Sequence, residues 1–246
     1  METFEDTLRP TGEPNPAKVE RLFNRIARRY DLTNRCLTLG IDLWWRRQLV
    51  MAVERCGPQE VVDLATGSGD VAFALRKRLS SEVSITGIDF CQALLDCADR
   101  RKAQHPSRAS VSFLKADCLD LPLEDESVDV VTIAFGLRNF ANRQQGLREM
   151  QRILRKPHGR LFILEFTQPA TWLRPFYYAY LSYGLPTLAG LITGAPSAYR
   201  YLTRSIKAFP DRLAMAAELR AEGFTSVSIT TFTGGMVALH EGAIGA

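Results

Sequence analysis

Glycines and carboxylates gather at the end of the first predicted strand. In VVDLATGSGD, residues 61–70, Gly67 and Gly69 form a turn in which backbone can pass close to a ligand, and Asp63 and Asp70 flank it. Two carboxylates beside a pyrophosphate would repel it, so the loop does not favour a dinucleotide. The pattern favours a ligand with a cationic ammonium end.

Two further acids follow the next strands. The second strand ends in the string TGIDF, which puts Asp89 at its carboxyl edge, where a carboxylate can accept hydrogen bonds from both hydroxyls of a ribose. Asp117 ends the third strand, in position to meet an adenine amino group. Ligands of open α/β sheets bind at the carboxyl ends of the strands, so these residues predict one nucleoside site. The alternative is that the glycines turn the chain and the acids cap helices.

The elements that position these residues alternate along the chain. We predict strands at 60–66, 83–89, 111–117, 128–135 and 159–166, with helices at 69–79, 91–103 and 142–154 between them. A helix at 211–223, capped by Asp211, and strands at 226–232 and 236–240 follow. This order predicts an α/β fold with a mostly parallel, seven-stranded sheet and helices on both faces.

Two additions extend this sheet within a single domain at 17–246. N-terminal helices at 17–56 include an amphipathic helix at 17–29 and a second helix with Asp42 as its N-cap. A helical, apolar insertion at 170–205 contains an uncharged run, 175–199, in which Pro186 favours two short helices over a membrane span. Residues 1–16 are expected to form a disordered tail.

Composition argues against several classes of protein. The chain has 246 residues, 46% hydrophobic and 24% charged, with a net charge of +4 and arginines spread along helices, so we predict no nucleic-acid partner. The five cysteines form no C-x-x-C pair and the three histidines lie far apart, so we predict no disulfide framework and no metal site. A reducing cytoplasm is the simplest location.

Together and in order, D-x-x-x-G-x-G and the two later acids resemble the class I S-adenosylmethionine-dependent methyltransferases, which have a Rossmann-like fold. Further strings, YDLTNRCLTLGIDLWW (30–45), FGLRN (135–139), RILRKPHGRLFILEFTQP (152–169) and YRYLTRSIKAFPD (199–211), are similar to the ubiquinone/menaquinone biosynthesis C-methyltransferase family. The similarity extends from about Lys18 almost to the end of the chain.

The resemblance implies an enzyme that transfers a methyl group from S-adenosylmethionine to a ring carbon of a polyprenylated hydroquinone. The acceptor would be demethylmenaquinol, 2-methoxy-6-polyprenyl-1,4-benzoquinol, or both. One alternative is an O- or N-methyltransferase of another small apolar acceptor. Another is a scaffold that binds the cofactor without catalysis in a quinone-synthesis complex.

The resemblance also implies which residues bind the cofactor. The implied positions, with the loop residues added on motif grounds, are Asp63, Gly67, Ser68, Gly69, Asp89, Phe90, Asp117 and Cys118. The chain departs from the family's usual Met, Ser and His at Thr33, Thr38 and Asp42. The change at Asp42 removes a basic group.

Arg138, Asn139 and Tyr30 are the candidate catalytic residues. A hydroquinone is electron-rich at the carbon ortho to an ionised oxygen, and Arg138 could lower the pKa of that hydroxyl and stabilise the oxyanion. The alternative for Arg138 is an ion pair with an acid such as Glu149 or Asp31. Asn139 could hydrogen-bond to the second ring oxygen. Tyr30 could face the sulfonium or pack on the N-terminal helix.

The proton acceptor stays open at this level. A guanidinium remains protonated, so Arg138 is not expected to act as the base itself. The candidates are His240, Asp31, Tyr30 and a water held by Arg138. His240 lies between apolar strand residues, where a lone histidine is more often a structural hydrogen-bonding group.

A polyprenyl tail needs an apolar groove, and the uncharged segment could supply it. Its candidate lining residues are Phe176, Tyr177, Tyr180, Leu181, Leu185, Leu188, Leu191 and Ile192. Tyr199, Arg200, Tyr201 and Arg204 at the rim could meet anionic lipid headgroups, which would be peripheral contact at the inner face of the membrane. A homodimer interface made of the same residues is the alternative, and the two interpretations are not exclusive.

Overall fold

The computed structural model describes residues 14–15, 17–21, 24, 38, 40–184 and 196–245, and for 196–200 it describes the backbone alone. Residues 17–21 and 24 are helical, as predicted. The remainder of that helix, Tyr30, Asp31, Pro186 and nearly all of the predicted tail lie outside the described residues.

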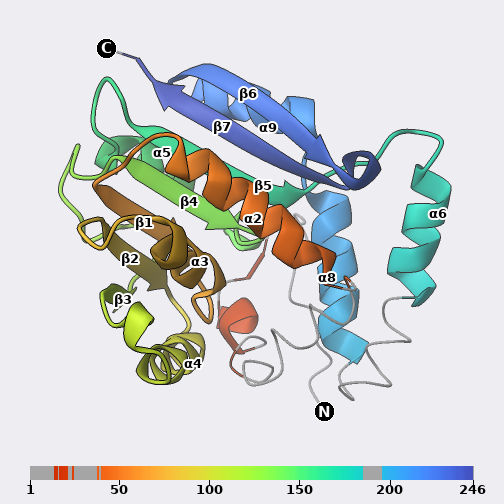
Figure 1. Ribbon diagram of the computed structural model, residues 1–246. Coiled ribbons are helices and arrows are strands. Elements are labelled where there is room, and N and C mark those ends of the chain that lie inside the picture. The colour runs from red at the N-terminus through yellow and green to blue at the C-terminus, as the bar shows by residue number, and fades with distance from the viewer. Residues whose placement is uncertain are drawn as a thin grey trace.

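Seven strands of the described chain form one sheet in the order β3-β2-β1-β4-β5-β7-β6 (Figure 1). Their bounds are β1 Glu60–Leu64, β2 Ser84–Asp89, β3 Val111–Lys115, β4 Val130–Ala134, β5 Arg160–Phe166, β6 Phe224–Phe232 and β7 Val237–Ile244. The first five strands run parallel, and β7 is antiparallel to both of its neighbours. The predicted mostly parallel, seven-stranded sheet is confirmed.

Helices cover both faces of the sheet, which explains why its central strands are continuous apolar runs. The bounds of the main helices are α2 Ile41–Glu54, α3 Asp70–Arg78, α4 Gln92–Ala103, α5 Arg143–Ile153 and α9 Arg212–Ala221. Side chains of α2 and α3, such as Val53 and Leu75, form one core with the sheet. Side chains of α5 and α9, such as Leu147 and Met215, form a second core. In Figure 1, α2 crosses the front of the sheet.

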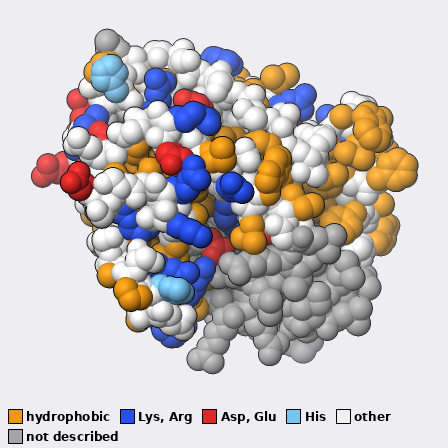
Figure 2. Space-filling model, in the orientation of Figure 1, with side chains coloured by type: hydrophobic (Ala, Val, Ile, Leu, Met, Phe, Trp, Pro, Cys, Tyr) orange, Lys and Arg blue, Asp and Glu red, His pale blue; other side chains and the backbone are white. Residues whose placement is uncertain are grey.

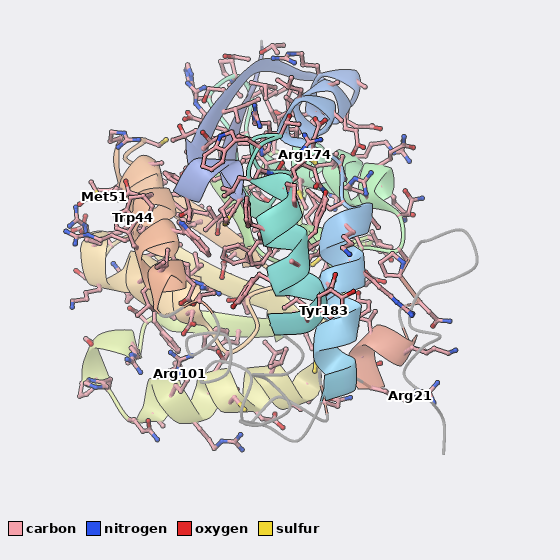
Figure 3. All side chains as sticks on the ribbon, turned by 90° about the vertical axis from the view of Figure 1, so that its right-hand side faces the viewer. Arg21, Trp44, Met51, Arg101, Arg174 and Tyr183 are labelled. Carbon is pink, nitrogen blue, oxygen red and sulfur yellow. The ribbon has the colours of Figure 1, made fainter. Side chains whose placement is uncertain are left out.

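The apolar insertion forms a helical layer at one end of the sheet (Figures 1 and 3). Helix α6, Arg174–Ala179, continues into the π-helical turn η4, Tyr180–Gly184, and α8, Pro196–Ala208, packs beside it. Tyr177, Leu181 and Tyr201 from these elements pack against Leu94 of α4 and Val19 near the N-terminus. None of the described helices is long and apolar enough to cross a membrane.

Short 3-10 turns complete the described chain. They are η2 Pro106–Arg108, η3 Leu137–Asn139 and η5 Thr233–Gly235. Turn η3 directly follows β4, so FGLRN leads out of the carboxyl end of a central strand.

The start of α2 differs from the prediction. Gly40, with φ 76°, occupies the N-cap position, and Asp42 lies inside the first turn. The carboxylate of Asp42 accepts hydrogen bonds from the Thr38 hydroxyl and from Arg46 one turn later, so it does not cap a backbone amide. By contrast, Asp211 caps α9 as predicted, because its Oδ1 accepts from the amides of Leu213 and Ala214.

Candidate active site

Strained backbone follows the central strands β1 and β4 at the carboxyl edge of the sheet. Ala65 and Phe135, the residues after these strands, have φ of 48° and 58°. This left-handed backbone conformation is unfavourable for residues other than glycine. A Cβ at Gly136 would lie 2.5 Å from the Ala65 Cβ, so the two turns are in close contact. A cavity lies in the crevice between them, lined by Ala65, Phe135 and Gly136 among others.

The glycine loop lies at one side of this first cavity. Gly67 and Gly69 have φ of 59° and 84°, which explains why the turn needs glycine at both positions. Gly67 and Ser68 line the cavity, whereas Gly69 starts α3 and packs on Phe73. A Cβ at Gly69 would approach Phe73 to 2.8 Å.

Asp63 differs from the prediction that it faces a ligand. Its side chain is 1% exposed and does not line the cavity. Its two oxygens accept hydrogen bonds from the hydroxyls of Thr66 and Thr132, both at 2.6 Å. Burial raises the pKa of this carboxyl to about 6. Asp63 therefore links the glycine loop to β4 through these two hydrogen bonds. The loop acid that lines the cavity is Asp70, which is ion-paired with Arg101 at 2.6 Å.

The acids after β2 and β3 lie where the sequence predicts, on the wall of the first cavity. Asp89 is buried, accepts from the amides of Gly67 at 2.8 Å and Cys91 at 2.9 Å, and burial raises its pKa. Asp117 accepts from the Leu119 amide at 2.9 Å. Six predicted cofactor residues thus line this cavity: Gly67, Ser68, Asp89, Phe90, Asp117 and Cys118. Burial raises the pKa of the Cys118 thiol to about 12, so it is neutral at pH 7.

The two polar side chains of the FGLRN segment, Arg138 and Asn139, line different cavities. Asn139 lines the first cavity, where its Oδ1 accepts from the Tyr201 hydroxyl at 2.9 Å. Arg138, 7% exposed, lines a second cavity instead. Its guanidinium donates to Glu165 of β5 at 2.8 Å and to the Phe135 carbonyl.

The ion pair offered as the alternative for Arg138 therefore exists, but with a different partner. Glu165 lies opposite because β4 and β5 are paired neighbours. The expected partner Glu149 binds Arg152 at 2.8 Å, and Asp31 lies outside the described residues.

The second cavity measures about 380 Å³ and has a largely apolar wall. Its lining residues in the described chain are Thr38, Ile41, Asp42, Trp45, Arg46, Phe135, Arg138, Phe166, Leu173, Phe176, Tyr177, Tyr180, Leu181, Leu202, Ile206, Thr233 and Met236. Four predicted groove residues of α6 and η4 are among them, while Leu185, Leu188, Leu191 and Ile192 lie outside the described chain.

Two side chains, Arg46 and Phe135, line both cavities. The Arg46 guanidinium carbon lies 5.1 Å from the centre of the Phe135 ring, and its Nη1 donates to Asp42 at 2.7 Å. Helix α2 is held in this place by the Trp45 indole, which donates to the Thr233 hydroxyl at 2.9 Å. A ligand in one cavity can therefore meet a ligand in the other beside Arg46 and Phe135.

Sequence reasoning missed Asp42, Arg46 and Glu165 as members of the site. An Asp and an Arg four residues apart are a readable helical pair, which is the signal that was available for the first two. Nothing local marks Glu165, because its partner is chosen by strand pairing.

Of the other candidates for the proton acceptor, His240 lies within the described chain and away from both cavities. His240 is buried on β7, lines neither cavity and has its Nε2 2.9 Å from the Arg212 carbonyl oxygen, while burial lowers its pKa. It is a structural group of the sheet. Tyr30 and Asp31 lie outside the described residues.

Comparisons with known proteins show the family and the fold. Residues 12–244 match the ubiE/COQ5 methyltransferase family. A demethylmenaquinone methyltransferase of Thermus thermophilus is 45% identical over 223 residues, which cover 90% of this chain and 99% of that protein. The ubiquinone/menaquinone biosynthesis C-methyltransferase UbiE of Geotalea daltonii is 39% identical, covering 92% of this chain and 95% of that one. A crystal structure of an S-adenosylmethionine-dependent methyltransferase of Thermotoga maritima has a TM-score of 0.64 at 17% identity, over 91% of this chain and 98% of that chain, which shows the shared fold.

Proposed function

The chain belongs to the ubiE/COQ5 methyltransferase family, and we propose that it methylates a ring carbon of a polyprenylated hydroquinone with S-adenosylmethionine as methyl donor. The observation that supports this most is the pair of adjoining cavities. One is lined by the glycine loop and carboxylates suited to a nucleoside, and the other is largely apolar and is lined by two arginines, Arg46 and Arg138. The names of the relatives support a naphthoquinol or a benzoquinol as acceptor.

The residues of the first cavity fit the methyl donor. Asp89 is a buried carboxylate on the cavity wall, and its two oxygens keep acceptor capacity beyond the two amides that they bind, as ribose hydroxyls require. Asp117 lines the same cavity, and we assign its carboxylate to the adenine amino group. S-adenosylmethionine supplies an electrophilic methyl group on a sulfonium. Phe135 and Asn139 line the part of the cavity that follows β4, and Asn139 is therefore assigned to this side rather than to a ring oxygen.

The second cavity fits an aromatic ring with an apolar tail. Phe135, Phe166 and Trp45 can pack on the ring, and Arg138 can donate a hydrogen bond to one of its two oxygens. A cation beside the hydroxyl lowers its pKa and stabilises the oxyanion, and the apolar wall strengthens that interaction by excluding water. Glu165 holds the Arg138 guanidinium in place from behind.

The outer surface of the α6 layer fits a lipid surface. Trp172, Phe176 and Tyr183 are 73%, 71% and 77% exposed, and in Figure 2 hydrophobic side chains gather over α6. Figure 3 shows Arg174 and Tyr183 toward opposite ends of this helical segment. Residues 167–210 contain arginines and a lysine but no acid, which favours anionic headgroups. Phe176 also lines the second cavity, so a tail could pass from the lipid to the acceptor site.

The lipid contact can be tested by sedimentation with vesicles of phosphatidylcholine, with and without phosphatidylglycerol. We expect binding that increases with the anionic lipid and that falls at least tenfold in Phe176→Glu. Leu114→Glu is the matched control, because Leu114 is also exposed but lies on β3, at the other edge of the sheet. Equal loss in both variants, or a dimer that hides this surface and binds no vesicles, would contradict the contact.

Methyl transfer can be tested with labelled S-adenosylmethionine and two reduced acceptors, a naphthoquinol and a benzoquinol with the same prenyl tail. We expect the label in the organic extract with at least one of them. Tight binding of the cofactor without transfer to either quinol would favour the scaffold alternative.

A further inference from the structure

We propose that Asp42 accepts the hydroxyl proton of the acceptor, and that Arg46 holds the resulting oxyanion beside the carbon that is methylated. The inference rests on the proposed function and names the proton acceptor that the sequence leaves open. It assigns Arg46 to the ring oxygen next to the methylated carbon and Arg138 to the oxygen across the ring.

The position of Arg46 supports this assignment. The methyl group must cross where the two cavities meet, and Arg46 lines both, whereas Arg138 lines the second cavity alone. The Nε of Arg46 is buried and has no hydrogen-bond partner in the described part of the chain. A buried guanidinium N–H without a partner is costly, so a ligand oxygen at this place would satisfy it.

The two carboxylates behind the arginines are not equivalent. Glu165 accepts from the Arg138 guanidinium, the Arg138 amide and the Phe166 amide, and it does not line the second cavity. Asp42 lines that cavity, and each of its oxygens accepts one hydrogen bond, from Thr38 or from Arg46, both at 2.7 Å. Each carboxylate oxygen has two lone pairs, so Asp42 keeps capacity for a substrate hydroxyl. Among the described lining residues it is the one carboxylate, and no imidazole is present there.

The step balances in protons and electrons. The hydroxyl proton moves to Asp42, and the lone pair left on oxygen delocalises onto the ortho carbon. That carbon forms its bond to the methyl group as the methyl–sulfur bond breaks, with the electron pair left on sulfur. The hydrogen on the same ring carbon then leaves to water as a proton, and the ring oxygen takes its proton back from Asp42. One proton is released for each methyl group transferred, and Asp42 ends as a carboxylate.

Other groups near Asp42 are few in the described chain. Arg46 is the cation of its own helix that lines the cavity, Arg138 reaches the cavity from the segment after β4, and Tyr177 and Tyr180 reach it from the α6 layer. Burial raises the pKa of both tyrosines, so they stay neutral at the pH of the assay.

The main test compares Asp42→Asn with Asp42→His. Asparagine keeps the size and one of the two acceptor oxygens but cannot take a proton, so we expect kcat to fall at least 100-fold with unchanged affinity for S-adenosylhomocysteine. Histidine can take a proton at a higher ordinary pKa, so we expect it to restore part of kcat and to move the acid limb of the pH–rate profile to higher pH. An Asp42→Asn enzyme with wild-type kcat, or an Asp42→His enzyme no faster than Asp42→Asn, would overturn the proposal.

Asp129→Asn is the matched control, because Asp129 is also ion-paired, with Arg155 at 2.6 Å, and lines neither cavity. We expect its kcat and pH profile to match the wild type. If the wild type itself transfers no methyl group to any quinol, the proposed function fails and not this assignment alone.

A second readout does not need turnover. We would bind 4-nitrophenol, whose ionisation changes its absorbance, to the protein without S-adenosylmethionine and titrate the bound dye. Because an opposite charge nearby favours the ionised form, we expect the pKa of the bound dye to be about one unit or more higher in Arg46→Gln than in the wild type. Equal values in the two proteins would contradict the oxyanion role of Arg46.

Discussion

The two cavities that meet at Phe135 and Arg46 are built in different ways. The first is made of backbone turns and acids that follow β1, β2, β3 and β4 within a few residues. The second is made of side chains from α2, β5, α6 and α8, which are far apart in the sequence. The first cavity, the proposed cofactor side, is therefore specified locally, and the second, the proposed acceptor side, by tertiary packing.

The two sides also differ in how their charges are held. On the cofactor side, Asp89 is bound by neutral backbone amides. On the acceptor side, Arg46 and Arg138 are each bound by a carboxylate in a largely buried place. Removing one partner of a buried ion pair leaves an uncompensated charge, whereas removing Asp89 leaves two neutral groups. The free energy of unfolding should therefore depend more on the ion pairs of the acceptor side. Cofactor affinity should depend more on Asp89 on the cofactor side.

The largest effect on stability is expected for Glu165→Ala. This change leaves the Arg138 guanidinium buried without its carboxylate, so we expect the free energy of unfolding to fall by about 3–5 kcal/mol in urea denaturation. The control is Glu54→Ala, which breaks the surface pair with Arg78 and should change stability by less than about 1 kcal/mol. Equal, small losses of unfolding free energy in Glu165→Ala and Glu54→Ala would contradict the claim that the buried ion pair stabilises the acceptor side.

The cofactor side is tested by Asp89→Ala. Loss of charged hydrogen bonds to two ribose hydroxyls and of the bond to the Gly67 amide should weaken S-adenosylhomocysteine binding about 100-fold or more, measured by calorimetry. Asp99→Ala, on the exposed side of α4, should bind as the wild type does. Unchanged affinity in Asp89→Ala would refute the ribose assignment.

The buried acid beneath the loop predicts a pH dependence of stability. The folded-state pKa of Asp63, about 6, lies above the ordinary value of 3.8, so the folded protein binds this proton more tightly than the unfolded chain. Stability from this group is therefore present at low pH and is lost as pH rises between about 4 and 6, by up to about 3 kcal/mol.

Asp63→Asn carries no such proton. We expect the difference in unfolding free energy between the wild type and Asp63→Asn to change across that pH range. As pH rises, the unfolding free energy of the wild type should fall relative to that of the variant. A constant difference would show that the carboxyl titrates alike in the folded and unfolded chains.

The smallest expected effects distinguish the two loop glycines. Both have positive φ, so alanine at either position should cost about 1 kcal/mol in strain. A Cβ at Gly69 would also meet Phe73 and Phe113 within 2.9 Å, whereas a Cβ at Gly67 would meet open space. Gly69→Ala should therefore lower the melting temperature more than Gly67→Ala. The reverse order would contradict the packing of the loop on Phe73.

The same contrast explains what the sequence could predict. Alternating strands and helices, the glycine loop and the acids Asp89 and Asp117 depend on spacing within short segments, and the structure places them as predicted. Asp63 has the expected position in the motif, but the orientation of its side chain depends on Thr132 of a neighbouring strand.

The acceptor side depends on packing that spacing does not contain. Arg138 meets Glu165 because Ala134 pairs with Leu164, and this register is not readable from either strand alone. Asp42 and Arg46 face the cavity because Trp45 bonds to Thr233, which is 188 residues away in the chain. The predicted N-cap at Asp42 was wrong for a local reason, since its carboxylate is engaged by Thr38 and Arg46, each four residues away.

The position of the transferred methyl group tests the central claim most directly. The protein would be given S-adenosylmethionine with a carbon-13-labelled methyl group and a reduced, prenylated hydroquinone, and the product would be examined by carbon NMR. We predict an aryl methyl signal that survives treatment cleaving methyl ethers. A methoxy signal that this treatment removes would show transfer to oxygen and would contradict the account.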